Sequence, residues 1–138
     1  MIILDTNVLS EVLRPRPDTE VLGWMARQQD VGTTAITVGE LLVGVRGLPA
    51  GRRRDDLIGA IEQSLVAFRG SILPYDEGAA RSYARMQERR RATGIPLARE
   101  DGMIAAICAT RSLVLATRNT KDFRDLDLEL VNPWDSGA

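Results

Sequence analysis

The sequence predicts a three-layer α/β/α domain, in which helices cover both faces of a central, mostly parallel sheet of about five strands. Short apolar stretches that are typical of strands alternate along the chain with longer amphipathic stretches that are typical of helices. The first stretch, 1–4, is apolar throughout, which indicates a strand buried on both faces of its sheet. A length of 138 residues favours one domain, and we expect it to span 1–138.

The predicted elements follow one another without an internal repeat or a linker. In chain order they are strand 1–4, helix 7–13, helix 19–29, strand 31–36, helix 37–51 with its terminal loop, helix 52–68, strand 71–74, helix 77–93, helix 98–111, strand 113–117, a turn or short helix at 119–123, and strand 128–132. The prolines of "RPRP" end the first helix, because proline cannot continue one. Asp18 and Asp76 directly precede two helices and are their expected N-caps. Glycine and proline end the helices 37–51 and 77–93.

Missing residue types exclude several kinds of chemistry. The chain has no histidine, which rules out Ser-His-Asp and Cys-His nucleophile systems, zinc sites that need histidine, and HExxH proteases. Its one cysteine, Cys108, cannot form an intrachain disulfide, which fits a reducing cytoplasm, and its apolar surroundings predict a buried thiol. No apolar run reaches the roughly 20 residues that span a bilayer, so we expect a cytoplasmic protein without a membrane partner.

Acidic and amide side chains stand where parallel α/β sheets bind their ligands, beyond the carboxyl ends of the strands. Asp5 ends the first strand, and Asn119 and Asp122 follow the last strand but one. Glu40 and Asp101 lie near the starts of two helices. We therefore expect the four acids to face one crevice at one edge of the sheet.

Each acid also has a purely structural explanation. Thr37 and Glu40 match a capping box, and Asn119 and Asp122 match a cap with its partner three residues further on. The other two acids can cap a helix or suit the positive end of a helix dipole. If the four acids converge, they also need a counter-charge, because carboxylates that lie close together repel one another. A hard cation such as Mg²⁺ or Mn²⁺ would neutralise them. Two such ions roughly 3.5–4 Å apart can clamp an in-line phosphoryl displacement.

Five blocks along the chain carry a resemblance to a known family. They are "MIILDTNVLSE", "ITVGELLVGV", "DGMIAAICA", "LATRNTKDF" and "LVNPW". In order and spacing they resemble the PIN-domain nucleases, most of all the VapC/FitB-type toxins of bacterial toxin–antitoxin pairs. The resemblance implies an endoribonuclease that depends on Mg²⁺ or Mn²⁺ and cuts cellular RNA. It also implies a small antitoxin that restrains the activity, and a toxin homodimer that can enter a larger toxin–antitoxin assembly.

The resemblance also implies roles for the acids. The family's three most regular acids fall on Asp5, Glu40 and Asp101. Asp5 and Asp101 would ligate a first metal ion directly, and Glu40 would act through that ion or through water. The family's next acidic position holds Asn119 here, whereas Asp122 matches a further acid of many members. Either of these two residues would complete the site by positioning a second ion or the attacking water.

Other residues are candidates for contact with substrate. Thr6 and Thr117 are expected to hydrogen-bond ligands or water, and Arg118 to touch a phosphate, so that Thr6 and Arg118 are the predicted substrate-binding residues. The arginine runs 52–54 and 89–91 are either solvated faces or a rim that gathers phosphates around an acidic pocket.

Apolar residues suggest where partners and the chain end would pack. We expect Trp24 in the core or at a dimer contact, and Trp134 to pack the C-terminal tail onto the domain. A groove between the early helices either receives an antitoxin helix or is ordinary core; its residues are Leu41, Leu42, Val45 and Leu48.

Two other functions compete with the nuclease. The first is a phosphotransfer enzyme in which Asp5 accepts a phosphoryl group and Lys121 steadies it. That chemistry commonly needs a second acid two positions after the acceptor, where this chain has Asn7. The second is a non-catalytic interaction module that uses the acids only as helix caps.

Overall fold

The computed structural model describes residues 1–135. Within them lies one sheet of five parallel strands in the order β3-β2-β1-β4-β5. The strands are β1 (Ile2–Leu4), β2 (Val31–Thr34), β3 (Ile72–Leu73), β4 (Val114–Ala116) and β5 (Leu130–Val131). The predicted fold class, with its mostly parallel sheet of about five strands, is therefore confirmed.

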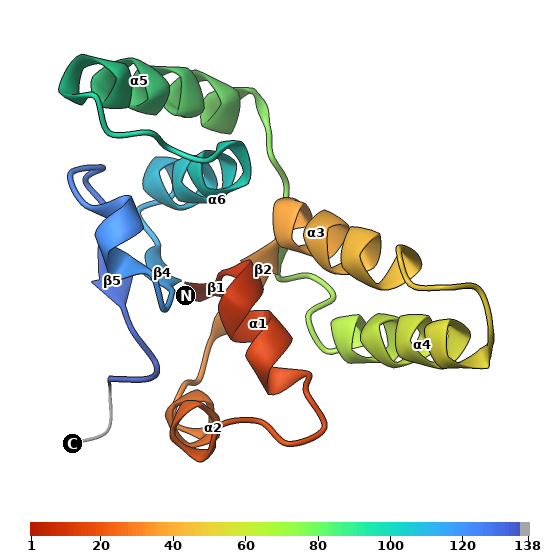
Figure 1. Ribbon diagram of the computed structural model, residues 1–138. Helices are drawn as coiled ribbons and strands as arrows, with labels where there is room; N and C mark the ends of the chain where they lie inside the picture. Colours follow the sequence, from red (N-terminus) through yellow and green to blue (C-terminus); the bar gives the residue numbers. More distant parts are fainter. Residues whose placement is uncertain (136–138) are drawn as a thin grey trace.

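Helices cover both faces of this sheet. They are α1 (Thr6–Val12), α2 (Thr19–Ala26), α3 (Ala35–Arg46), α4 (Arg52–Val66), α5 (Glu77–Thr93) and α6 (Arg99–Thr110), with a short 3-10 helix, η1 (Thr120–Phe123). Helices α5 and α6 lie side by side on one side of the molecule, whereas α1, α2 and α4 lie on the other (Figure 1). Helix α3 leaves the end of β2 and packs against α1 and α4.

Two apolar clusters, one on each side of the sheet, form the core. Ile3 and Leu115 belong to the cluster that includes α6, whereas Leu4 and Ala116 belong to the cluster that includes α1 and Trp24. Successive residues of a strand point to opposite faces, so neighbouring positions of β1 and β4 serve both clusters. All four strand residues are fully buried, which explains why the first stretch of the sequence is apolar without alternation.

The strand order places a topological switch point at β1. The chain builds β2 and β3 on one side of β1 and then returns to build β4 and β5 on the other. Ligands of open parallel sheets bind beyond the carboxyl ends of the strands at such a point. Asp5 follows β1 directly, and its backbone N–H donates to the carbonyl of Ala116 at the end of β4, 3.0 Å away.

Several local predictions can now be compared with the structure. Cys108 is buried, as expected. Trp24 is a core residue with 4% of its surface exposed. Trp134 is half-buried and packs against the same cluster, which confirms that it holds the C-terminal segment on the domain. Among the described residues, none of the helices has the length and apolar character that crossing a membrane requires.

Candidate active site

Asp5 is both a strand-end acid and a helix cap. Its side chain is buried, with 5% exposed, and Oδ1 accepts a hydrogen bond from the backbone N–H of Val8 at 2.9 Å, so Asp5 is the N-cap of α1. Burial raises the pKa of the Asp5 carboxyl above its ordinary value, against a side-chain hydrogen bond from Thr117 and backbone hydrogen bonds from Val8 and Asn7 that lower it. Capping of α1 accounts for the hydrogen bond to one oxygen of the Asp5 carboxylate. It does not account for the burial of this carboxylate near other acids.

The interpretation of Thr37 and Glu40 as a capping box was wrong. Helix α3 begins at Ala35, and its N-cap is Thr34, whose hydroxyl accepts from the backbone N–H of Thr37 at 3.1 Å. Because the cap lies three residues earlier than expected, Glu40 falls in the second turn. There its Oε1 accepts a hydrogen bond from the hydroxyl of Thr6 at 2.5 Å, which turns Glu40 toward the start of α1 and Asp5.

Asp101 lies in the first turn of α6, as predicted. Its pKa is raised to about 6, first by burial and then by the negative charges of four other acids. Those acids are Asp5, Glu40, Asp122 and Glu100. Repulsion of this kind requires proximity, so the structure brings all four predicted site acids into one electrostatic neighbourhood. Within residues 1–135, no hydrogen bond to the Asp101 carboxylate offsets it.

Asn119 and Asp122 do not form the predicted cap pair, and this prediction was also wrong. Asn119 occupies the N-cap position of η1 but makes no side-chain cap hydrogen bond, and only the backbone N–H of Asp122 bonds to its carbonyl, at 2.9 Å. The backbone N–H of Asn119 donates instead to the hydroxyl of Thr117 at 3.1 Å. Asp122 contributes to the raised pKa of Asp101, whereas Asn119 lines a separate hollow with Asn7 and Arg118.

Within residues 1–135, no basic side chain forms a salt bridge with these acids. In the described part of the chain, the salt bridges of arginine and of the N-terminus all go to other carboxylates. Also within residues 1–135, no three acidic side chains already stand close enough together to hold an ion. The donor set is nevertheless all carboxylate oxygen without counter-charge, and hard cations such as Mg²⁺ and Mn²⁺ prefer that set. The residues present therefore fit a hard divalent ion.

Arg90 has a structural role that differs from both predictions for the run 89–91, a solvated face or a rim that gathers phosphates. It is buried, with 5% exposed, and donates from Nη2 to the carbonyls of Asp122 at 2.8 Å and Arg124 at 2.9 Å. Nη1 donates to the carbonyl of Pro96 at 3.3 Å. Helical spacing was the available signal, because Arg90 continues the buried face of α5 formed by Ala79, Ser82 and Met86.

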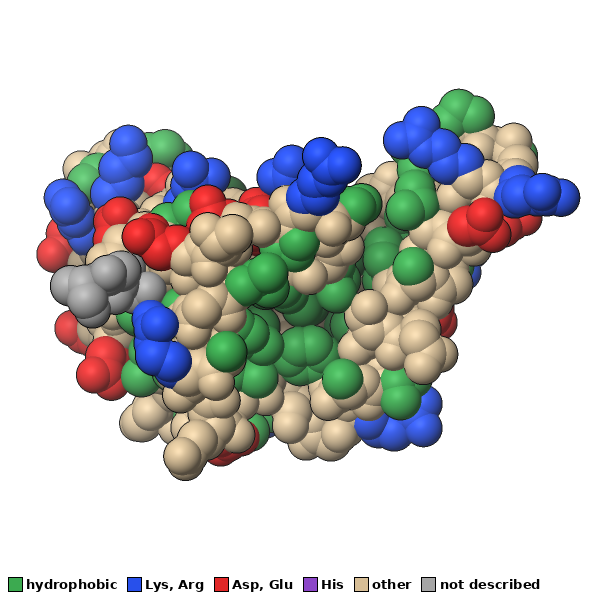
Figure 2. Space-filling model, turned by 90° about the horizontal axis from the view of Figure 1, so that it is seen from below, with side chains coloured by type: hydrophobic (Ala, Val, Ile, Leu, Met, Phe, Trp, Pro, Cys, Tyr) green, Lys and Arg blue, Asp and Glu red, His purple; other side chains and the backbone are tan. Residues whose placement is uncertain are grey.

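The predicted apolar groove exists as an open hollow between α1, α3 and α4. Leu41, Val45 and Leu48 line it with residues of α4, and Thr6 and Glu40 stand among its walls; its volume is about 380 Å³. Leu42 is half-buried and does not line it. Figure 2 shows such a hollow, floored by hydrophobic side chains, in the middle of the face seen from below.

Comparisons with known proteins agree on one family. The family model of the PIN domain matches residues 2–129. The chain is 39% identical over 138 residues to VapC ribonuclease Y4jK of Sinorhizobium fredii, covering 98% of this chain and 99% of that protein. It is 43% identical over 137 residues to toxin FitB of Neisseria gonorrhoeae, covering 97% and 99%. The crystal structure of FitAcB from Neisseria gonorrhoeae matches with a TM-score of 0.90 at 43% identity, over 98% of this chain and 99% of that chain.

Proposed function

Because this chain belongs to the PIN-domain family, we propose that it is a metal-dependent endoribonuclease, the toxin of a toxin–antitoxin pair that cuts cellular RNA in the cytoplasm. The observation that carries the proposal is geometric: Asp5 follows β1, the Thr6 hydroxyl holds Glu40 toward the start of α1, and Asp101 lies in the first turn of α6. The raised pKa of Asp101 agrees with this arrangement, and within residues 1–135 none of these acids forms a salt bridge. Carboxylates that only cap helices have no reason to share one neighbourhood. The activity belongs to a single domain over 1–138.

Asp5 and Asp101 would hold the ion directly, and Glu40 would act beside them. When bound, Mg²⁺ or Mn²⁺ neutralises the carboxylates and supplies an activated water for attack on the scissile phosphorus. The Val8 N–H fixes the orientation of Asp5, and the Thr6 hydroxyl fixes that of Glu40. These two hydrogen bonds would restrict the motion of both carboxylates before substrate arrives.

Asp122, rather than Asn119, completes the site in this proposal. A charged oxygen ligand is what a second ion or an attacking water needs, and the charge of Asp122 already acts on Asp101. Asn119 faces the neighbouring hollow. Replacing Asp122 with Asn should therefore lower cleavage more than replacing Asn119 with Ala.

The antitoxin would occupy the apolar hollow between α1, α3 and α4. An amphipathic helix laid in such a groove buries its apolar face, and Glu40 at the groove wall brings the partner next to the acids. A similar crystal structure, 30% identical, is that of a member of the VapBC family of toxin–antitoxin systems from Mycobacterium tuberculosis. The proposal also includes a homodimer of the toxin and a larger assembly of toxin with antitoxin, as the family resemblance implies.

The decisive experiment separates the nuclease from a helix-capping module and from a phosphotransfer enzyme. Purified protein freed of antitoxin should cleave RNA only with Mg²⁺ or Mn²⁺, and Asp5→Asn or Asp101→Asn should lower the rate by on the order of 100-fold or more. Calorimetric titration with Mn²⁺ should give binding that Asp101→Ala abolishes. Glu62→Gln, an exposed acid on α4, is the matched control and should change neither measurement.

Wild-type cleavage in Asp5→Asn, or no Mn²⁺ binding at millimolar concentration, contradicts the proposal and favours the module. A phosphorylated protein labile to hydroxylamine would favour phosphotransfer instead.

A further inference from the structure

A second hollow adjoins the apolar groove along α1, where Ser10 lines both. Its volume is about 470 Å³ and its walls are polar side chains from α1 and from the loop after β4, closed by one aromatic ring. The lining residues are Asn7, Ser10, Glu11, Arg14, Arg118, Asn119 and Trp134. Asn7, at the start of α1, and Asn119, in the loop after β4, place one end of the hollow near the carboxyl edge where Asp5 lies.

One wall of this hollow is a stacked pair of side chains. The guanidinium carbon of Arg118 stands 4.7 Å from the centre of the Trp134 ring. Asn132 joins the two, since its Oδ1 accepts from the Trp134 backbone N–H at 2.9 Å and its Nδ2 donates to the Arg118 carbonyl at 3.4 Å. Arg118 is exposed, and in the described part of the chain its guanidinium forms neither a hydrogen bond nor an ion pair.

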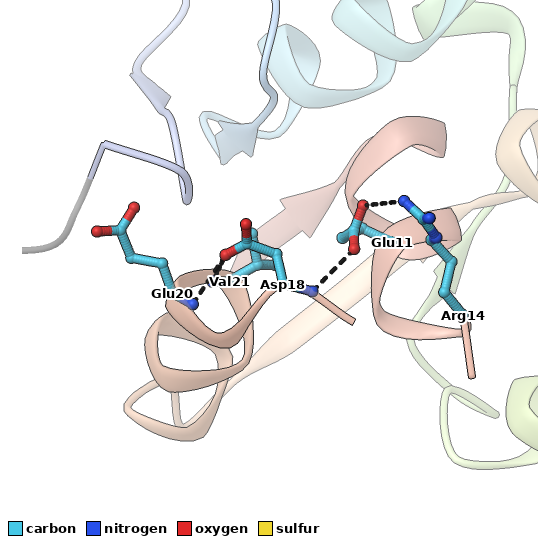
Figure 3. A network of polar contacts seen from close by, with 5 residues as sticks. All are labelled: Glu11, Arg14, Asp18, Glu20 and Val21. Atoms are coloured by element: carbon cyan, nitrogen blue, oxygen red, sulfur yellow. Dashed lines mark hydrogen bonds and ion pairs between the residues drawn. The ribbon is translucent and has the colours of Figure 1, made fainter. Parts of the chain in front are cut away.

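The opposite wall holds a second arginine in place. Glu11 is almost fully buried; its Oε1 accepts from Arg14 Nη1 at 3.2 Å, and its Oε2 accepts from the backbone N–H of Asp18 at 2.9 Å. Figure 3 shows Glu11 lying between Arg14 and the start of α2. Both oxygens of Glu11 are therefore used, while Arg14 keeps donors that no other described residue accepts from.

We propose that this hollow binds the nucleotide that flanks the scissile phosphate of single-stranded RNA. The proposal rests on the nuclease function proposed above and names where its substrate is held. Arg14 and Arg118 contact backbone phosphate, and the base packs against the Arg118–Trp134 pair.

Charge and size both support this occupant. The acids of the site repel a polyanion, so an RNA strand needs cationic contacts close beside them. The volume of the hollow falls in the range of small-ligand sites, roughly 300–1,000 Å³. With one indole at its wall the hollow offers a single stacking place, and since every base has a π-face, that contact tolerates any base.

Trp134 is also a reporter for the test. The chain has two tryptophans, and replacing the core residue Trp24 with Phe leaves Trp134 as the only source of indole emission. In the Asp101→Asn background, which is expected to cleave far more slowly and carries less negative charge, we titrate a single-stranded RNA hexamer without divalent ion. We expect a saturable change in the emission of Trp134.

Substitutions in the hollow should weaken this binding in a characteristic way. Arg14→Ala and Arg118→Ala should each weaken it roughly tenfold. Each should also reduce the slope of log affinity against log salt by about 0.7, the value for one lost phosphate contact to a single strand. Arg69→Ala, an exposed arginine between α4 and β3 at the opposite edge of the sheet, should leave the slope unchanged. A Trp134→Phe protein that retains Trp24 should give no emission change.

The outcomes separate the two proposals. RNA cleavage by the wild type together with an unchanged salt slope in both arginine variants overturns the nucleotide site and leaves the nuclease standing. Saturable binding at Trp134 together with a wild-type protein that does not cleave RNA with Mg²⁺ or Mn²⁺ overturns the nuclease and, with it, the role beside a scissile phosphate, and leaves the hollow as an RNA-binding site only. Variants that lose antitoxin binding while RNA binding persists also overturn the site, and assign the hollow to the protein partner.

Discussion

Asp101 illustrates how single residues of this site work against the stability of the metal-free fold. Its raised pKa means that the carboxylate is more costly to charge in the folded chain than in the unfolded one. Burial and the neighbouring acids cause that cost, and a bound cation would remove it. Asp5 differs, because its burial is partly offset by hydrogen bonds, including the one that caps α1.

The pH dependence of stability tests this account. The pKa of Asp101 is about 6 when folded against 3.8 ordinarily, so the folded chain binds more protons between these values and loses stability as pH rises from about 4 through 6. Without metal at pH 7.5, Asp101→Asn should raise Tm by about 3–5 °C, the effect of roughly 1 kcal/mol in a domain of this size. Thermal melts at pH 7.5 and pH 4 measure the difference. An equal gain at both pH values would contradict the explanation, because at pH 4 little of the charge remains.

The position of a candidate residue can be predicted from sequence where that residue and the sheet topology alone decide it. Asp5 follows an apolar strand, and the carboxyl edge of a parallel sheet is fixed by topology, so its place was predictable. The direction of Glu40 was not, because Thr34 and Thr37 can each cap α3 and only the packed structure selects Thr34. The hydrogen bond from Thr6 to Glu40 links residues 34 positions apart and has no local signature.

At the scale of elements, every helix and strand of the described chain was predicted in the right order, and the errors lie at boundaries and in tertiary roles. Hydrophobic periodicity and turn-forming residues are local properties, so they can be recognised in the sequence. The burial of Arg90 is not local, since its carbonyl partners belong to η1 and to segments beyond α5. Helix α5 thus holds η1, and with it Asp122, against the rest of the domain.

The contribution of the Arg90 hydrogen bonds to stability and to the position of η1 can be measured. Arg90→Ala removes the donor for three carbonyls, of Pro96, Asp122 and Arg124. The free energy of unfolding should fall by about 2–4 kcal/mol, and kcat for RNA cleavage should fall as Asp122 loses its fixed position. Denaturant unfolding and steady-state kinetics provide the two values.

Arg91→Ala is the control, because the neighbouring arginine is exposed and should cost little in either measurement. Equal effects of the two substitutions would show that Arg90 is an ordinary surface arginine in solution.

At the scale of the whole molecule, an acidic centre and an apolar groove share a wall. Glu40 lines the same groove as Leu41, Val45 and Leu48, so a partner bound there lies next to the proposed catalytic acids. A surface of this kind can bind a partner and block a substrate in a single contact. The net charge of −1 makes whole-molecule attraction to RNA weak, which leaves substrate binding to local arginines.

Partner binding and catalysis should therefore separate by mutation. Leu57→Glu places a charge in the groove at a side chain that is already 37% exposed, so the fold should survive. We expect antitoxin affinity to fall by at least tenfold, because a charge would be desolvated at an apolar contact, while RNA cleavage stays within twofold of wild type. Calorimetry with the purified antitoxin and a cleavage assay measure the two effects.

Val66→Glu, also on α4 but outside the groove and 47% exposed, is the control and should keep antitoxin binding. If both variants bind antitoxin normally, the partner lies elsewhere.

The position of β1 in the middle of the sheet also bears on the order of events during synthesis. β1, which Asp5 follows directly, is synthesised before β4, the strand that completes it on one side. A nascent chain in which β4 has not yet formed therefore lacks the assembled group of acids. That group should come together only after β4 and the segments that carry Asp101 and Asp122 have been synthesised.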